Sequence, residues 1–184
     1  MVNLNKAVFL DRDGVLVKSI IKNKKGYAPL SLQNFKIYKH SKQCVKKLSS
    51  VGFKIFVVTN QPDVGKKILP KKKLNQMHKI LKKKTSIKNI YTCTHTSKQF
   101  CICRKPKPGM LIKAAKVHNI NLKKSYMVGD RAIDITCGKR AGCKTIFINR
   151  NYEEKKPKSQ NASFKNLIEA TNYIIERTDY EKIK

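Results

Sequence analysis

The stretch from Ala7 to Gly14 runs AVFLDRDG, four apolar residues followed directly by two aspartates and a glycine. A short apolar run that ends in a turn signal is typical of a buried strand. Expected strands that start at residues 54, 89 and 126 also lead straight into polar motifs. Helix-period segments separate these runs, which indicates an α/β fold whose parallel strands are joined by right-handed crossovers.

We expect a Rossmann-like three-layer α/β/α fold, in which helices cover both faces of a parallel sheet. The length of 184 residues suits one domain over residues 1–184. A polar segment with Pro157, residues 152–163, predicts a surface connection. Helices are expected at residues 40–51 and 71–83, from near Pro108, and at 164–176, because apolar residues recur there at helical spacing. Strands are expected at residues 7–10, 54–58, 89–93, 126–128 and 145–148.

The hydrophobic content of 40% is ordinary for a globular protein, and no apolar run reaches the roughly 18 residues of a membrane span. The first six residues lead directly into the first strand and lack the apolar region and cleavage site of a signal peptide. We therefore expect a monomer in the cytoplasm with no membrane association.

The charge is strongly positive: 42 Lys and Arg against 11 Asp and Glu give a formal net charge of +31. Such a field attracts nucleic acid or other anions. Only six of the basic residues are Arg, the side chain that bidentate phosphate and base recognition favours. We interpret the charge mainly as solvated surface that also attracts a small phosphorylated substrate, and nucleic-acid binding is the alternative.

Only five acidic residues precede Glu153, and four of them are Asp11, Asp13, Asp130 and Asp134. They form a D-x-D motif and a G-D-x-x-x-D motif, each at the end of an expected strand. A third strand ends at Thr59-Asn60-Gln61. Because ligands of open α/β sheets bind outside the carboxyl ends of the strands, the three motifs predict one pocket.

This set of side chains suits phosphoryl transfer. Carboxylates of Asp11 and Asp130 can hold Mg²⁺, which offsets the repulsion between a carboxylate and a phosphate. Asp11, at a strand end, is placed for nucleophilic attack, and Asp13 for general acid and base work. The Thr59 hydroxyl and a fixed lysine, for which we select Lys105, can stabilise the phosphoryl group.

Two interpretations of the acidic motifs remain open at this point. A D-x-D motif alone equally fits a turn with two solvated carboxylates, and only its combination with the later motifs favours a site. Asp134 can bind a water near the metal or start the helix that follows, where a carboxylate complements the helix dipole.

A second cluster consists of Cys93, His95, Cys101 and Cys103. Three sulfurs and an imidazole are a typical ligand set of a structural Zn²⁺ site, and free thiols near a loop are the alternative. This zinc would fold the loop that presents Arg104 and Lys105 to the pocket. The remaining histidines, His40, His78 and His118, fall in or beside helices without an apparent partner, and we interpret them as surface or packing residues.

The strings FLDRDGVL, VVTNQ, CTH followed by CICRKPKPGML, and MVGDRAID resemble the haloacid dehalogenase superfamily, and within it the branch of heptose-bisphosphate phosphatases and histidinol phosphatases. The resemblance implies a phosphatase without a separate cap domain. It implies that Asp11 is the nucleophile and Asp13 the acid and base, while Thr59 and Lys105 stabilise the phosphoryl group. Mg²⁺ would be bound by Asp11, the Asp13 carbonyl and Asp130. The predicted substrate-binding residues are Gly26, Tyr27, Asn60, Gln61, Arg104 and Arg131.

Two segments bear on the substrate. Arg131 stands where many heptose phosphatases carry Lys, and the segment from Gln61 to Lys67 differs from the usual small-residue version. Gly109-Met110 and Ala141-Gly142-Cys143 are more similar to the sugar-phosphatase branch. We favour a heptose phosphate over histidinol phosphate, and a nucleic-acid 3′-phosphatase is a further alternative.

Overall fold

Six parallel strands form the centre of the protein in a computed structural model that describes the backbone of residues 4–183 and the side chains of residues 4–178. The strand order is β5-β4-β1-β6-β7-β8, so β1 lies between β4 and β6. Leu10 of β1 pairs with Val57 on one side and with Val128 on the other. The strands are β1 (Lys6–Leu10), β4 (Phe53–Asn60), β5 (Asn89–Cys93), β6 (Tyr126–Gly129), β7 (Lys144–Ile148) and β8 (Ala162–Phe164).

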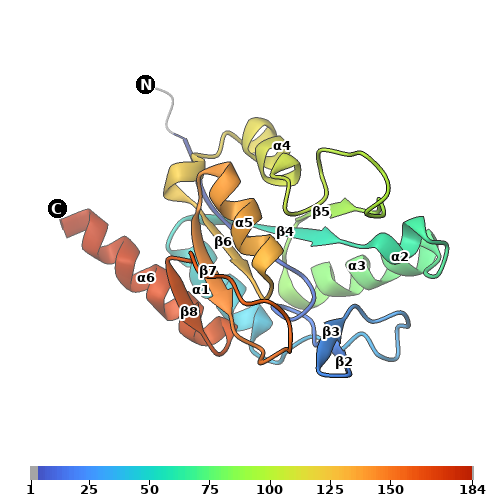
Figure 1. Ribbon diagram of the computed structural model, residues 1–184. Helices are drawn as coiled ribbons and strands as arrows, with labels where there is room; N and C mark the ends of the chain where they lie inside the picture. Colours follow the sequence, from blue (N-terminus) through green and yellow to red (C-terminus); the bar gives the residue numbers. More distant parts are fainter. Residues whose placement is uncertain (1–3, 184) are drawn as a thin grey trace.

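Helices cover both faces of this sheet (Figure 1). One face packs against α1 (Ser41–Ser50), α3 (Lys71–Thr85) and α6 (Leu167–Ile183), and the other against α4 (Gly109–His118) and α5 (Ala132–Ala141). Val8 and Leu10 point to the first layer, whereas Ala7 and Phe9 point to the second. All four are fully buried, because a central parallel strand is covered on both sides. The predicted three-layer α/β/α fold is confirmed.

The five expected strands and the four expected helices are present, with ends shifted by three residues or fewer except at the end of α6, which extends to Ile183 instead of residue 176. Helix α5 was expected only as the helix that Asp134 could start, without bounds. The short elements were not predicted: the hairpin of β2 (Ile20–Lys22) and β3 (Lys25–Tyr27), helix α2 (Pro62–Gly65) and the 3₁₀ turn η1 (Leu122–Lys124).

The connection predicted for residues 152–163 is wrong at its end, where β8 begins at Ala162. The preceding Asn161 exchanges hydrogen bonds with Thr145 of β7. Three half-exposed edge residues carry no apolar run, so the pattern could not indicate this strand.

The order of the strands creates a switch point at β1. The chain moves from β1 outward to β4 and β5, then returns to β6 on the other side of β1 and continues to β7 and β8. Loops after β1, β4 and β6 therefore diverge in direction and leave a crevice between them.

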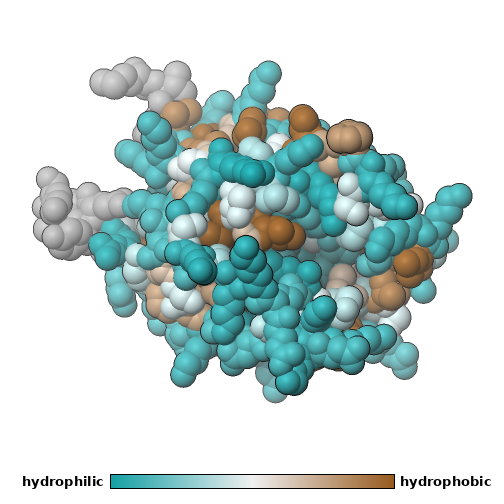
Figure 2. Space-filling model, viewed as in Figure 1, coloured by the Kyte–Doolittle hydropathy of each residue, from teal (hydrophilic) through white to brown (hydrophobic). Residues whose placement is uncertain are grey.

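Hydrophilic residues cover most of the face shown in Figure 2, and no helix of the described residues is long and apolar enough to cross a membrane.

Candidate active site

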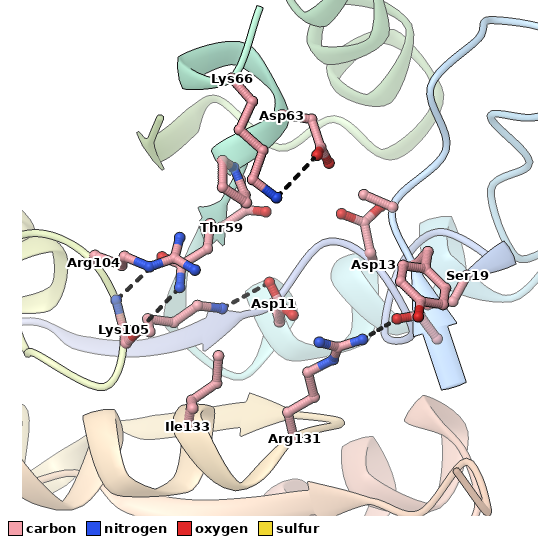
Figure 3. A pocket seen from close by; sticks show the side chains of 15 residues that line it. Asp11, Asp13, Ser19, Thr59, Asp63, Lys66, Arg104, Lys105, Arg131 and Ile133 are labelled. Atoms are coloured by element: carbon pink, nitrogen blue, oxygen red, sulfur yellow. Dashed lines mark hydrogen bonds and ion pairs between the residues drawn. The ribbon is translucent and has the colours of Figure 1, made fainter. Parts of the chain in front are cut away.

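A pocket of about 200 Å³ opens at this switch point. Its walls come from the ends of β1 and β4, the β2–β3 hairpin, α2, the loop that carries Lys105, and the start of α5 (Figure 3). Predicted site residues that line it are Asp11, Asp13, Gly26, Tyr27, Thr59, Asn60, Arg104, Lys105 and Arg131.

Asp11 lies at the floor of the pocket, held by the sheet that precedes it. Its backbone N–H donates to the carbonyl of Val128 at 2.9 Å, so the strand pairing of β1 with β6 extends to this residue. Its Oδ1 accepts from the Arg12 backbone N–H and from Lys105 Nζ, both at 2.8 Å. The side chain is 11% exposed, which leaves the carboxylate accessible from the pocket alone.

Lys105 places a buried ammonium group between two carboxylates. Its Nζ lies 2.8 Å from Asp11 Oδ1 and 2.6 Å from Asp134 Oδ1, and it donates to the Val58 carbonyl at 2.9 Å. All three donor positions of the ammonium are therefore used. Burial alone would lower the pKa of Lys105, but Asp11 and Asp134 outweigh it and raise that pKa, so the group stays charged.

Asn60 fixes the backbone of Lys105. The Asn60 amide donates to the Lys105 carbonyl at 3.0 Å and accepts from the Lys105 N–H at 3.1 Å. Asn60 is the last residue of β4, so the sheet itself sets the position of the lysine loop. Asn60 thus lines the pocket as predicted, and its amide is used to hold Lys105.

Asp134 joins the start of α5 to Lys105. Its Oδ2 accepts from the Arg131 N–H at 3.0 Å, as the acidic residue of a capping box does, while Oδ1 contacts Lys105. A Cβ on Gly129 would lie 2.1 Å from the Asp134 Cβ, so only glycine permits this approach of α5 to β6. Of the two interpretations left open for Asp134, these contacts support the helix start.

Asp130 is buried beside the same cluster, and neither of its carboxylate oxygens has a hydrogen-bond partner at normal distance among the described residues, although the Tyr152 hydroxyl is close enough to oppose the rise that burial causes in the pKa of Asp130. A Cβ at Gly14, where φ is +81°, would lie 1.8 Å from Asp130 Oδ2. Gly14 therefore provides both the turn and the space for this carboxylate.

The cluster carries more negative than positive charge. Oxygens of Asp11, Asp130 and Asp134 lie within 4.8 Å of one another, and the Lys105 ammonium pairs with the first and the last of these. Burial, opposed by Lys105, raises the pKa of Asp11 to about 6. Burial with Asp11 and Asp134 nearby raises the pKa of Asp130 well above its ordinary value. Clustered hard oxygen ligands with unused lone pairs fit a divalent cation such as Mg²⁺.

Asp13 is held on the opposite side of the pocket from Lys105 (Figure 3). Its carboxylate accepts from the Arg12 guanidinium at 3.0 to 3.1 Å and from the Gln61 amide at 2.8 Å. The same Gln61 nitrogen lies 2.8 Å from the Thr59 hydroxyl.

His78 was interpreted as a residue without a partner, which is wrong, because its Nε2 lies 3.3 Å from Arg12 Nη1. Gln61 itself is fully buried and does not line the pocket.

Arg131 closes one wall of the pocket. Its Nη2 donates to the Gly26 carbonyl of the β2–β3 hairpin and lies 3.3 Å from Glu154 Oε1. A Cβ at Gly26 would lie 2.6 Å from the ring of Tyr152, so the hairpin packs closely on the segment after β7. Arg131 is thus a bridge between three segments as well as a pocket residue.

Six further pocket residues were not predicted as site residues: Ser19, Ala28, Pro62, Asp63, Lys66 and Ile133. Lys66 extends from the end of α2 with its Nζ 3.9 Å from Asp63 Oδ1. Gly65 packs against the carbonyl of Thr94, which its Cβ would approach to 2.3 Å. The motif that follows β4 gave no sign of a helix here, because α2 is only one turn long.

Cys93, His95, Cys101 and Cys103 come together as predicted. Cys93 Sγ lies 3.9 Å from Cys101 Sγ and 3.5 Å from His95 Nδ1, which is 3.3 Å from Cys103 Sγ. Bond lengths of about 2.3 Å for Zn–S and 2.0 Å for Zn–N require separations of roughly 3.8 and 3.5 Å at the edges of a tetrahedron. These three separations lie within about 0.2 Å of those values, and all four ligand atoms lie within 4.8 Å of one another, so the cluster suits one Zn²⁺. Arg104, next in the chain, donates to the His95 carbonyl at 3.1 Å.

Comparisons with known proteins identify the family of this chain. The sequence model of the haloacid dehalogenase-like hydrolases matches residues 15–148. The D-glycero-beta-D-manno-heptose-1,7-bisphosphate 7-phosphatase of Helicobacter pylori is 34% identical over 91% of this chain and 98% of its own length. The bifunctional histidine biosynthesis protein HisB of Blochmanniella floridana is 31% identical over 77% of this chain and 40% of its length.

A solved structure has the same fold. The D,D-heptose 1,7-bisphosphate phosphatase from B. bronchiseptica, complexed with magnesium and phosphate, superimposes with a TM-score of 0.79 at 22% identity, over 94% of this chain and 99% of that one.

Removal of the unpartnered carboxylate tests the cation site. In EDTA at pH 7.5 we expect Asp130→Asn to raise the melting temperature, because a buried charge without a partner is lost. In the unsubstituted protein Mg²⁺ should raise the melting temperature, and in Asp130→Asn this rise should disappear. Thermal melts with and without Mg²⁺ provide the measurement.

The stabilisation of the protein by Mg²⁺ should also depend on pH. Since the folded protein holds the proton on Asp11 more tightly than the unfolded chain, with a pKa of about 6, the metal-free protein should lose stability as the pH rises through about 6. The raised pKa of Asp130 acts in the same direction. Stabilisation by Mg²⁺ should accordingly be larger at pH 7.5 than at pH 5.5. Asp63→Asn, outside the cluster, is the matched control and should keep the full response. A magnesium response that persists in Asp130→Asn would argue against this site.

Proposed function

This chain belongs to the family of haloacid dehalogenase-like hydrolases, and on that basis we propose that it is a Mg²⁺-dependent phosphatase that removes the 7-phosphate of D-glycero-D-manno-heptose 1,7-bisphosphate. The observation that carries the proposal is the buried Lys105 ammonium beside Asp11 at the pocket floor. A nucleophilic carboxylate next to a fixed cation is the arrangement that attack on a phosphate requires. The named relatives support the choice of substrate.

The residues divide the chemistry between them. Asp11 is the nucleophile, aimed by the rigid end of β1, and it forms an aspartyl-phosphate. Lys105 and the Thr59 hydroxyl stabilise the charge on the transferred phosphoryl oxygens. Asp13 gives a proton to the leaving oxygen and then accepts one from the attacking water. Asp11, Asp130 and the carbonyl of Asp13 would hold Mg²⁺, which supplies the charge that lets an anion approach a phosphate.

Positive side chains at the pocket wall support a substrate with a second phosphate. Lys66 and Arg104 lie across the pocket from Arg131, and all three line it (Figure 3). A bisphosphate can use both its phosphates in such a pocket, whereas histidinol phosphate presents an amine to the same cations. We therefore keep histidinol phosphate as the alternative small-molecule substrate, supported by the likeness to HisB.

We also propose that the cluster of Cys93, His95, Cys101 and Cys103 binds one structural Zn²⁺. All four ligand positions are protein atoms, so this metal has no open position for chemistry. Its role is to fold the loop that carries Arg104 and Lys105.

The absence of disulfides among the cysteines, all within the described residues, supports a reducing compartment, and we place the protein in the cytoplasm. That the protein is a monomer with a single domain remains a prediction.

Binding of a polyanion such as nucleic acid is a second candidate function, favoured by one surface feature. A groove of about 680 Å³ between residues 35–39, α1 and α3 is lined by Lys36, Lys39, Lys42, Lys83 and Lys84. None of these five lysines forms an ion pair with another described residue. We call this surface the lysine groove.

Phosphate release tests the enzymatic proposal. The protein should hydrolyse heptose 1,7-bisphosphate with a higher kcat/KM than histidinol phosphate or a 3′-phosphorylated oligonucleotide, and EDTA should stop the reaction. Asp11→Asn should lower kcat by at least about 10³-fold, because an amide cannot form the phosphoenzyme. Asp63→Asn serves as the control for loss of an acidic pocket residue. Wild-type turnover by Asp11→Asn would disprove the mechanism.

Metal analysis tests the zinc site. Protein purified without chelator should contain one equivalent of zinc per chain. Cys101→Ser should lose the metal and, because the loop then no longer holds Lys105, should lower kcat by roughly 10- to 100-fold. Cys44→Ser, a cysteine outside the cluster, should keep its zinc. Metal-free wild-type protein with full activity would contradict the proposal.

Salt dependence tests the polyanion candidate. Binding of a single-stranded oligonucleotide through six to ten phosphate contacts should weaken by roughly 10³- to 10⁵-fold between 50 and 200 mM salt. Changing Lys36, Lys39 and Lys83 to Glu should reduce the affinity far more than the same change at Lys113, Lys116 and Lys123, on and beside α4. No binding at physiological salt, or equal losses in the two triple variants, would remove this candidate.

A further inference from the structure

Arg12, the central residue of the D-x-D motif, is fully buried although it is a charged residue next to an open pocket. Its guanidinium contacts the Asp13 carboxylate three times: Nε lies 3.1 Å from both oxygens, and Nη2 lies 3.0 Å from Oδ2. A planar guanidinium fixes the orientation of a carboxylate as well as its charge, which an ammonium group does not. Arg12 therefore determines how Asp13 faces the pocket.

His78 of α3 holds the far side of the same guanidinium. Its Nε2 lies 3.3 Å from Arg12 Nη1, and burial together with the charge of Arg12 lowers the pKa of His78 to about 4. The imidazole is thus neutral near pH 7, and Nε2 can accept a hydrogen bond from Nη1. The Phe35 ring lies against the guanidinium, 5.4 Å from its centroid to the Arg12 Cζ. Arg12 is enclosed by an acceptor, an aromatic face and Asp13.

The contacts distinguish the two oxygens of Asp13. Oδ2 accepts from two nitrogens of Arg12 and from the Gln61 amide at 2.8 Å. Oδ1 has one contact, with Arg12 Nε at 3.1 Å. Because Oδ2 is occupied by three donors, Oδ1 is the oxygen with capacity left for a proton.

We propose that Arg12 and His78 are positioning residues that fix the Asp13 carboxylate so that its Oδ1 carries the proton of the reaction. This inference rests on the proposed phosphatase function. As a bond forms between Asp11 and phosphorus, the bond from phosphorus to the leaving oxygen breaks, and that oxygen takes the proton from Oδ1. Water then attacks phosphorus, the bond to Asp11 breaks, and Oδ1 receives the proton of the water. The Arg12 ion pair stabilises the carboxylate that remains between the two steps.

The contribution of a proton donor to the rate depends on the leaving group. A loss of rate that differs between leaving groups therefore distinguishes the positioning of a proton donor from a purely structural role. An alkoxide from a sugar or alkyl phosphate is a poor leaving group and needs the proton. A nitrophenolate leaves without one. Since kcat/KM reports the first phosphoryl transfer alone, misplacement of Oδ1 lowers kcat/KM for the alkyl substrate selectively.

The experiment compares His78→Leu with His78→Gln, whose amide oxygen can accept from Arg12. For His78→Leu we expect kcat/KM to fall by roughly 10- to 100-fold on the best alkyl phosphomonoester and by less than about threefold on p-nitrophenyl phosphate. His78→Gln should remain within about threefold of the unsubstituted protein on both. His118→Leu is the matched control, because His118 of α4 packs on Phe56, away from the pocket, and should not change the ratio of the two substrates.

Equal losses on the two substrates in His78→Leu, or no rescue by His78→Gln, would overturn the positioning role and leave the proposed function intact. If the unsubstituted protein hydrolyses neither class of phosphate, the proposed function and this inference fail together. If His78→Leu does not fold, His78→Gln is compared with His78→Asn, whose shorter amide cannot reach Arg12. We then expect His78→Asn to show the selective loss of kcat/KM on the alkyl phosphate, and equal losses on the two substrates would again overturn the positioning role.

Discussion

The site depends on one buried ammonium group that pairs with two of three clustered, buried carboxylates. Lys105 contacts Asp11 and Asp134 at 2.8 and 2.6 Å, while Asp130 forms no ion pair or hydrogen bond of normal length with another described residue. Removing charges from water is costly, and one ammonium cannot compensate three carboxylates. This imbalance is what a divalent cation would relieve. The Asp11 carboxylate, which we propose as the nucleophile, is thus held in place but not fully neutralised by its neighbour.

The position of Lys105 is set from two directions. Asn60, the last residue of β4, holds its backbone through a pair of hydrogen bonds, and the Cys/His cluster folds the segment immediately before it. Arg104 is tied back to the cluster through the His95 carbonyl. The zinc proposed for the cluster would therefore act on catalysis through geometry alone, since it stabilises the loop from which the lysine reaches the carboxylates.

Acidic residues are scarce outside the pocket and its carboxylate cluster. Between Asp13 and Asp130 the chain contains one acidic residue, Asp63, and it lies at the pocket wall. The lysines remain largely on the surface, and five of them line the lysine groove on the α1 and α3 side of the sheet. On the inner side of α3, His78 reaches Arg12 behind the pocket. One helix thus contributes Lys83 and Lys84 to the lysine groove and His78 to the contact with the D-x-D motif.

The sequence by itself determined the sheet, the pocket and the Cys/His cluster, because each depends on local pattern. An apolar run that stops at Asp11, Thr59 or Asp130 specifies a buried strand and the edge where its polar residues emerge. Only the tertiary structure decided which polar groups pair. His78 is 66 residues from Arg12, and Lys105, in a loop, meets Asp134 in the first turn of α5. The edge strand β8 likewise forms only because β7 supplies partners. Such contacts are fixed by how helices pack on the sheet, and neither spacing nor composition records that packing.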